Sequence, residues 1–239
     1  MKPLSLLAAL ALGCTLSTAT LADQMEPLEL DHSSTALLIT DPQNDFLREG
    51  GAAYELVKDN LKQLGTIDNI GSLFQAAKDV DLAVFVSPHW YFPHDDHWQY
   101  RGALQQTIND IGMFKRASVT DAGDLTNSGA DFYEPYKKYI YDGKTVISSP
   151  HKVYGPDSND LVLQLRKRGI QTVLIGGMAA NLCTDSHMRE LVENGFEVIM
   201  IKDAVGAPGE AAYQAALTNY GMIANSVIST ADAIELIDP

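Results

Sequence analysis

The chain has few cysteines, an excess of acidic residues and only one long apolar run. Two cysteines, Cys14 and Cys183, occur in 239 residues, and Lys and Arg number 17 against 31 Asp and Glu, for a formal net charge of −14. This acidic balance argues against nucleic acids and anionic membrane surfaces as partners. The sequence also has no glycine-rich phosphate loop and no zinc-type cysteine pair. A small-molecule site remains compatible with all of these absences.

The apolar run lies at the start of the chain and predicts a signal peptide over residues 1–22. Lys2 supplies a positive start, Leu4 to Leu12 an apolar core, and Thr20-Leu21-Ala22 a small-x-small cleavage site. The run is shorter than the roughly 20 residues of a membrane-spanning helix, which disfavours an anchor. Cys14 leaves a lipoprotein open, although Ala11-Leu12-Gly13 is a poor lipobox. We expect a single domain over 23–239, periplasmic or secreted, with no membrane association after cleavage.

Removal of the signal peptide would leave Cys183 as the one cysteine, so no internal disulfide can form. A lone thiol in an oxidising compartment is a liability unless it is buried or has a task. Many free cysteines are small buried hydrophobes, and this alternative stays open for Cys183.

Six apolar runs of strand length alternate with segments of helical spacing. Continuous apolar strands connected by helices are typical of parallel sheets. The sequence therefore predicts an α/β fold, a Rossmann-like three-layer α/β/α sandwich around a six-stranded, mostly parallel sheet. The expected strands are Thr35–Thr40, Leu82–Val86, Thr145–Ser148, Val173–Ile175, Phe196–Ile201 and Ser226–Ser229, and helical spacing covers 54–78, 160–168, 181–194, 211–220 and 231–237.

Three reactive side chains follow three of the predicted strands. Asp41 precedes Pro42 at the end of the first strand, Lys152 lies beyond the third, and Cys183 opens the helix after the fourth. Ligands bind at the carboxyl ends of the strands in open α/β sheets, so this edge is the expected site. A position in the first helical turn predicts a lowered thiol pKa for Cys183. The structural alternatives are a turn aspartate and a solvated lysine.

Two further segments are candidates for shaping the site. Ser87 to Trp98 is rich in aromatic residues, and we interpret it as a substrate-facing loop in which His89, Trp90 and Tyr91 contact the substrate. A metal site stays open as the alternative for this loop, because His89, His94 and His97 with Asp95 and Asp96 could bind zinc or iron, but two prolines and the lack of helical register disfavour it. The irregular insertion Gly102 to Tyr141 covers the site or forms an oligomer contact.

Three motifs give the chain a resemblance to the isochorismatase-like cysteine hydrolases, which include nicotinamidases and carbamoylsarcosine amidases. The first is Asp41-Pro42-Gln43-Asn44-Asp45-Phe46 after an apolar strand, and the second is the lysine after the third strand. The third is Gly177 to Cys183 leading into a helix, followed by Asp203-Ala204 after the next strand. The resemblance covers about Thr35 to Asp232.

The resemblance implies a catalytic triad of Asp41, Lys152 and Cys183. It also implies a cis peptide between Met178 and Ala179, and an oxyanion hole formed by the N–H groups of Ala179 and Cys183. The sequence Lys152-Val153-Tyr154-Gly155-Pro156 lacks the family's Ser-Ala-Phe, which leaves Lys144 as the alternative lysine. The family further implies a dimer or tetramer.

No metal or other cofactor is expected, because Ser87-Pro88-His89 lacks the aspartate of the nicotinamidase metal motif. The predicted function is hydrolysis of a C–N bond in a small carboxamide or a carbamoyl or ureido compound through a Cys183 thioester. Vinyl-ether hydrolysis of the isochorismate type and a non-catalytic small-molecule binding protein are the alternatives. Within the site, a Cys183–His187 pair on one helix face is the rival to the carboxylate base.

Overall fold

The computed structural model describes residues 29–239; the predicted signal peptide, residues 1–22, lies outside this part. All six described strands form one sheet in the order β3-β2-β1-β4-β5-β6, and every neighbouring pair is parallel. The predicted α/β fold with a six-stranded parallel sheet is confirmed. The strands are β1 (Thr35–Thr40), β2 (Ala83–Ser87), β3 (Val146–Ile147), β4 (Thr172–Met178), β5 (Glu197–Gly206) and β6 (Ser226–Ile228).

This strand order places β1 and β4 side by side at the centre of the sheet, with the chain continuing outward from them in opposite directions. Such a reversal opens a crevice beyond the carboxyl ends of the two strands, where ligands of open α/β sheets bind. The register pairs Thr40 with Gly177, so both strands end at the same level. The residues that follow β1 and β4 therefore flank this crevice.

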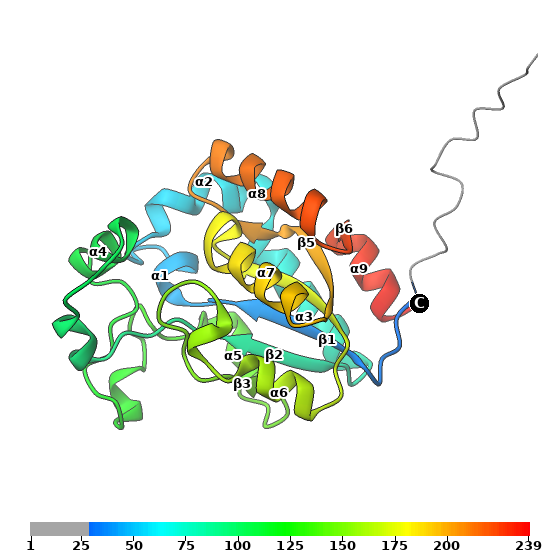
Figure 1. Ribbon diagram of the computed structural model, residues 1–239, viewed down its shortest axis with the longest axis horizontal. Helices are drawn as coiled ribbons and strands as arrows, with labels where there is room; N and C mark the ends of the chain where they lie inside the picture. Colours follow the sequence, from blue (N-terminus) through cyan, green and yellow to red (C-terminus); the bar gives the residue numbers. More distant parts are fainter. Residues whose placement is uncertain (1–28) are drawn as a thin grey trace, which may run out of the picture.

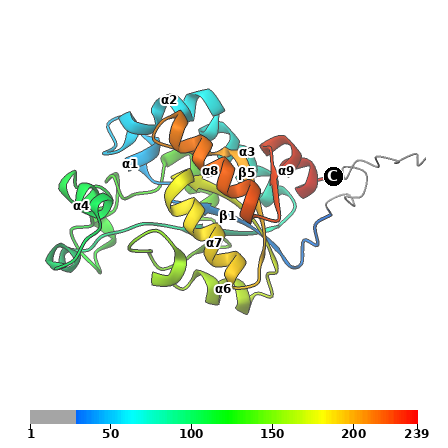
Figure 2. The same cartoon turned by 45° about the horizontal axis from the view of Figure 1, so that its top comes forward.

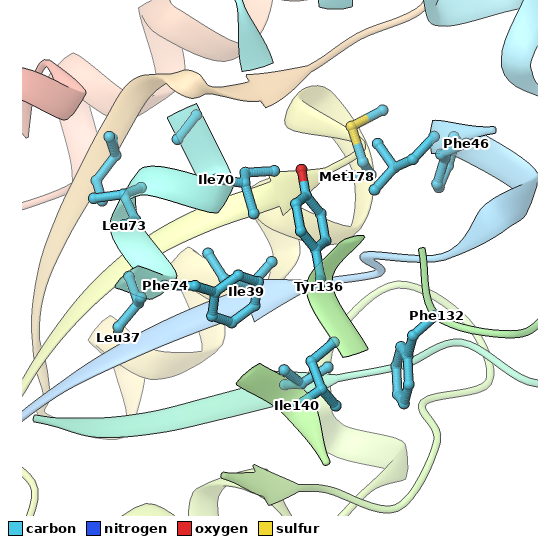
Figure 3. Close-up of a cluster of buried hydrophobic side chains, with 14 of the residues drawn as sticks. Leu37, Ile39, Phe46, Ile70, Leu73, Phe74, Phe132, Tyr136, Ile140 and Met178 are labelled. Carbon is cyan, nitrogen blue, oxygen red and sulfur yellow. The ribbon is translucent and has the colours of Figure 1, made fainter. Parts of the chain in front are cut away.

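Alternation along each strand divides the core into two halves. In β1, Leu37 and Ile39 face one side of the sheet, whereas Ala36 and Leu38 face the other. Successive strand side chains point to opposite faces, so a strand buried on both sides is apolar throughout. We call the side that Leu37 and Ile39 face the first face of the sheet. Figure 3 shows part of the core on this face, in which Phe74 and Tyr136 pack beside Ile39.

Helices cover both faces of the sheet. The first face carries α2 (Tyr54–Leu64), α3 (Thr66–Asp79), α5 (Lys137–Ile140) and α9 (Thr230–Ile237). The second carries α6 (Leu161–Lys167), α7 (Asp185–Glu193) and α8 (Glu210–Ile223), which lie together in Figures 1 and 2. Two further helices, α1 (Asn44–Leu47) and α4 (Ala103–Asp110), lie at the end of the molecule toward which β1 points (Figure 1).

The helical segment predicted over 54–78 is two helices rather than one. Gly65 has a φ of 68°, which ends α2 and turns the chain into α3. Glycine adopts this left-handed conformation without the steric penalty of a Cβ atom, so apolar spacing alone does not reveal the break. In the described part of the chain, each helix is too short or too polar to cross a membrane.

Candidate active site

Asp41, His89, His151 and Cys183 meet at the carboxyl edge of the sheet. One ligand atom from each of the four side chains lies within 4.8 Å of the others, and all four residues are buried. Asp41 follows β1 and Cys183 follows β4, so the central crevice brings the predicted acid and sulfur together. His89 follows β2 and His151 follows β3, and a short parallel bridge pairs these two residues beyond the strands.

Asp41 is held by the imidazole of His151. His151 Nε2 donates a hydrogen bond of 2.7 Å to Asp41 Oδ1, and both side chains are fully buried. The second carboxylate oxygen, Oδ2, has no hydrogen-bond partner among the described residues. Asp41 also has a φ of 47°, an uncommon backbone conformation that is frequent at functional sites.

Lys152 lies apart from this pair. Its Nζ donates to Asp95 Oδ2 at 2.5 Å and to the carbonyl oxygen of Trp90 at 2.8 Å. The structure thus puts His151 in the place beside Asp41 that the resemblance gave to Lys152. His151 forms an isolated bridge and Lys152 begins the bend that follows it, so two adjacent residues take different places. The sequence feature that indicated a different role for Lys152 was the segment after it, which is shorter than in the family and lacks its Ser-Ala-Phe.

The alternative lysine lies elsewhere as well. Lys144 Nζ donates to Asp81 Oδ1 at 2.6 Å, and both side chains of this pair are largely exposed. Neither lysine therefore faces the carboxylate of Asp41 in the way that His151 does.

The turn after β4 aims the sulfur at the crevice. The peptide bond between Met178 and Ala179 is cis. The chain continues in one π-helical turn, Ala180–Thr184, before α7 begins. Thr184 donates its N–H to the carbonyl oxygen of Ala179 at 3.2 Å, and its hydroxyl lies 2.9 Å from that of Thr40. This second contact ties the cysteine turn to the end of β1, next to Asp41.

The environment raises the pKa of the Cys183 thiol well above its ordinary value. Burial is the main cause, and the charge of Asp41 and its hydrogen bond with the thiol add to it, whereas the amides of Ala179 and Cys183 act in the opposite direction. The direction is the reverse of that expected from a helix terminus, because desolvation penalises the thiolate more than the turn stabilises it. The resting sulfur is protonated at neutral pH and needs a base, and Asp41 is the carboxylate beside it.

Gln43 and Asp45 of the first motif are structural. Gln43 accepts a hydrogen bond from the N–H of His89 at 2.8 Å and donates to the carbonyl oxygens of His89 and Ala130, which joins three loops. Asp45 accepts from the N–H groups of Ala52 and Phe114. These bonds fix the loops that carry the catalytic candidates.

His187 is turned away from the thiol. Its Nδ1 donates to the carbonyl oxygen of Cys183 at 2.7 Å, and its Nε2 accepts from the Ser87 hydroxyl at 2.8 Å. Burial, with a contribution from His151, lowers the pKa of His187 to about 3, so the ring is neutral. With both nitrogens engaged, the Cys183–His187 pair has no free base to offer.

The aromatic loop contributes mainly through His89. Burial lowers the pKa of His89 well below its ordinary value, so this ring is also neutral. The Trp90 indole donates to the carbonyl oxygen of Ala130, and Tyr91 packs edge-on against Trp98. Neither Trp90 nor Tyr91 belongs to the cavity lining described below.

The group of potential metal ligands found among residues 29–239 does not include His94 or His97. The His94 side chain is 63% exposed and contacts Asp95 at 3.4 Å. The aromatic loop therefore does not bring its histidines together.

An apolar cavity of about 90 Å³ opens beside Cys183. Part of the Gly102–Tyr141 insertion forms one wall, so this segment borders the site. The lining contains no Asp, Glu, Lys or Arg. The lining residues are Phe46, Ala53, Leu56, Val57, His89, Leu104, Thr107, Ile108, Ile111, Met113, Phe114, Tyr154, Ala179, Leu182, Cys183 and Pro208.

The six-stranded parallel sheet, with Asp41 and Cys183 at the carboxyl ends of its central strands, defines an α/β protein with a candidate site at the central crevice. Residues 35–232 match the isochorismatase domain. The chain belongs to the isochorismatase family and is a hydrolase of that family.

Individual relatives agree with this assignment. The chain is 29% identical over 199 residues to the ureidoacrylate amidohydrolase RutB of Variovorax paradoxus, covering 80% of this chain and 76% of that protein. It is 25% identical to the protein of the same name from Agrobacterium fabrum, covering 77% of this chain and 81% of that protein.

Solved structures share the fold. A cysteine hydrolase from Pseudomonas syringae pv. phaseolicola superimposes with a TM-score of 0.70 at 21% identity, covering 88% of this chain and 95% of that one. The N-carbamoylsarcosine amidase of Thermoplasma acidophilum gives a TM-score of 0.60 at 17% identity, covering 82% of this chain and 96% of that one.

Proposed function

We propose that this protein hydrolyses the C–N bond of a small carboxamide through a thioester on Cys183. The observation that carries the proposal is the convergence of the buried Cys183 thiol with the carboxylate of Asp41, whose Oδ1 is bound by His151. A thiol with a raised pKa needs an adjacent base to become a nucleophile.

In the first half of the reaction, the thiol proton moves to Asp41 and the sulfur attacks the carbonyl carbon. The resulting oxyanion is stabilised by the N–H groups of Ala179 and Cys183, an assignment supported by the lowering effect of these two amides on the thiol pKa. Each such donor is typically worth about 10²–10³ in rate. The C–N bond then breaks as Asp41 returns the proton to the leaving nitrogen.

In the second half, Asp41 takes a proton from water, and the oxygen attacks the thioester carbonyl. The C–S bond breaks, the carboxylic acid leaves, and the proton returns to the sulfur. His151 is a positioning residue in this scheme, because its Nε2 binds Oδ1 and leaves Oδ2 for proton transfer.

The cavity favours a short apolar acyl group. A carboxylate buried in this lining would have no cationic partner, which costs several kcal/mol. Lys152 is not among the lining residues and is engaged by Asp95. Among the substrate classes expected from the sequence, simple carboxamides therefore fit better than ureido acids.

The nucleophile is tested by incubating the protein with a panel of short aliphatic and aromatic amides. Mass spectrometry of quenched reactions should find the acyl group on Cys183, and Cys183→Ala should abolish both the adduct and turnover. Full activity of Cys183→Ala would refute the thioester mechanism.

The substrate class is tested separately with Leu104→Arg, which puts a cation into the cavity wall. We expect kcat/KM to fall for apolar amides and to rise for amides bearing a carboxylate. Leu163→Arg is the matched control, because Leu163 is 55% exposed in α6 and does not line the cavity. Wild-type preference for ureidoacrylate or N-carbamoylsarcosine over neutral amides would contradict the apolar assignment.

We also propose that the protein acts outside the cytoplasm as a dimer or tetramer. The signal-peptide pattern of residues 1–22 supports export, and the family resemblance supports assembly. Sequencing the N-terminus of the protein from a fractionated native host should give a start at Asp23. Sedimentation of the same material gives its subunit number.

A further inference from the structure

We propose that Asp41, His89, His151 and Cys183 also form a binding site for one thiophilic divalent cation, with Zn²⁺ as the reference ion. Their four side chains each bring one ligand atom within 4.8 Å of the others, and all are buried. A thiolate, two imidazoles and a carboxylate are a ligand set that suits Zn²⁺.

The ring nitrogens leave suitable lone pairs. Carbonyl and carboxylate oxygens only accept, so His89 Nε2 donates to the carbonyl oxygen of Lys152 at 3.3 Å and His151 Nε2 donates to Asp41. A metal ion bound at Nδ1 of either ring would leave these outer contacts in place. Nδ1 of His89, Nδ1 of His151 and Oδ2 of Asp41 all lack a partner among the described residues.

Such atoms are unusual, because about 90% or more of buried polar groups are hydrogen-bonded. Three such atoms belong to residues of the same buried cluster as the Cys183 sulfur, which points to a ligand that several side chains can bind together. The outer contacts of the two imidazoles are those that orient histidine ligands in metal sites, where the second ring N–H bonds a carboxylate or a carbonyl oxygen.

The distances are within reach of a tetrahedral ion. Bonds of about 2.0–2.1 Å to nitrogen and 2.3 Å to sulfur put neighbouring ligand atoms roughly 3.3–3.8 Å apart. Atoms that now lie within 4.8 Å must therefore close by at most about 1.5 Å, which small side-chain rotations supply. The sulfur and the imidazoles favour Zn²⁺ and Co²⁺ over Mg²⁺ and Ca²⁺.

The metal site depends on His151 lying beside Asp41, where the family resemblance implied a lysine. A lysine ammonium beside Asp41 would repel a cation and offer no lone pair. In this chain the nearby ammonium, Lys152 Nζ, is bound by Asp95, and His151 offers a nitrogen instead.

Binding is tested on the full-length protein, freed of metal by chelator, by titration with Zn²⁺ against a chromophoric chelator and by titration with Co²⁺. We expect one equivalent of either ion and a thiolate-to-cobalt charge-transfer band. Loss of a direct ligand should cost more than the 10–100-fold typical of outer contacts, so Cys183→Ser should weaken Zn²⁺ binding by at least about 100-fold and remove the band. His97→Gln is the control, since this exposed histidine of the same loop lies outside the cluster.

Absence of binding, a cobalt spectrum without the thiolate band, or unchanged affinity in Cys183→Ser would each overturn the site. A second readout does not depend on any variant. Bound Zn²⁺ should protect Cys183 from iodoacetamide, measured on the Cys183 peptide by mass spectrometry, and a chelator should restore labelling. Iodoacetamide labelling of Cys183 that saturating Zn²⁺ does not reduce would also overturn the proposal.

One consequence rests on the proposed function. A sulfur bound to Zn²⁺ is not free to attack a carbonyl, so Zn²⁺ should inhibit amide hydrolysis reversibly. Metal binding with Cys183 protected but hydrolysis unaffected would leave the site in place and would overturn the thioester mechanism instead.

Discussion

The buried pair formed by Asp41 and His151 makes a quantitative prediction that needs no substrate. The pair has a 2.7 Å hydrogen bond between fully buried groups, and the other carboxylate oxygen has no partner among the described residues. Removing the partner of a buried charged group typically costs about 3–5 kcal/mol, because the remaining carboxylate stays desolvated and unpaired. We therefore expect His151→Leu to lower the free energy of unfolding by about that amount.

Asp41→Asn should cost less, since the amide keeps an oxygen that accepts from His151 and removes the buried charge. In Asp41→Asn, the additional change His151→Leu leaves a neutral amide without its partner rather than a buried carboxylate. The double variant should therefore be more stable than the sum of the single effects predicts, by about 1.5–3 kcal/mol, the usual worth of a hydrogen bond to a charged group. Urea unfolding of the four proteins of the cycle measures this coupling.

A control cycle distinguishes the effect of His151 on Asp41 from that of its chain neighbour, Lys152. Lys152→Met combined with Asp41→Asn should be additive, because Lys152 binds Asp95 and the Trp90 carbonyl oxygen. Sites that share no partner usually add within about 0.3–0.5 kcal/mol. Additivity in the His151 cycle, or coupling in the Lys152 cycle, would refute the placement of His151 against the carboxylate.

Two further predictions concern stability. Gly177→Ala should lower the free energy of unfolding, measured in urea, by several kcal/mol, because the φ of Gly177 is 121° and a Cβ atom would meet the backbone of Thr40. Gly143→Ala is the control: Gly143 has a φ of 80° and no atom within 4 Å of an added Cβ, so this change should cost only about 1 kcal/mol. Equal costs for the two variants would contradict the predicted clash at Gly177. Burial raises the pKa of Asp142, but hydrogen bonds from Lys78 and from two backbone N–H groups outweigh it and lower that pKa to about 2. A pKa lower in the folded than in the unfolded chain stabilises above about pH 4, and this stability is lost between pH 4 and pH 2. Asp142→Asn should therefore remove about 1–2 kcal/mol at neutral pH and less at pH 2, and a pH-independent loss would contradict this.

Most of the architecture follows from apolar patterning. Six short apolar runs predicted the six strands, and the continuous runs indicated parallel pairing because both faces of such strands are buried. The same logic predicted that Asp41 and Cys183 would meet, since each follows a strand end. What the pattern did not contain is the break at Gly65, where one residue in the left-handed region replaces a continuous helix by two.

The site was harder to predict at the level of single residues. His151 and Lys152 are neighbours, and their different places depend on the isolated bridge that His151 forms and on the bend that begins at Lys152. His151 carries no periodic signal of its own, and its importance follows only from the bridge to His89 and the bond to Asp41. The direction of the thiol pKa was missed for a related reason: sequence reveals a helix start, but not that the sulfur is buried beside a carboxylate.

Amide hydrolysis through Cys183 and cation binding at the same cluster both depend on His151 lying where the resemblance implied a lysine. The two activities exclude each other. With an imidazole next to Asp41, the carboxylate is oriented by a ring whose second nitrogen can bind a metal ion, whereas an ammonium would have given charge and no lone pair. The proton acceptor that makes Cys183 a nucleophile and the oxygen that would complete a metal site are therefore the same atom, Oδ2 of Asp41. A metal ion and an acyl group cannot occupy the sulfur together. Zn²⁺ should therefore compete with formation of the acyl adduct on Cys183, and the apparent inhibition should weaken as amide concentration rises.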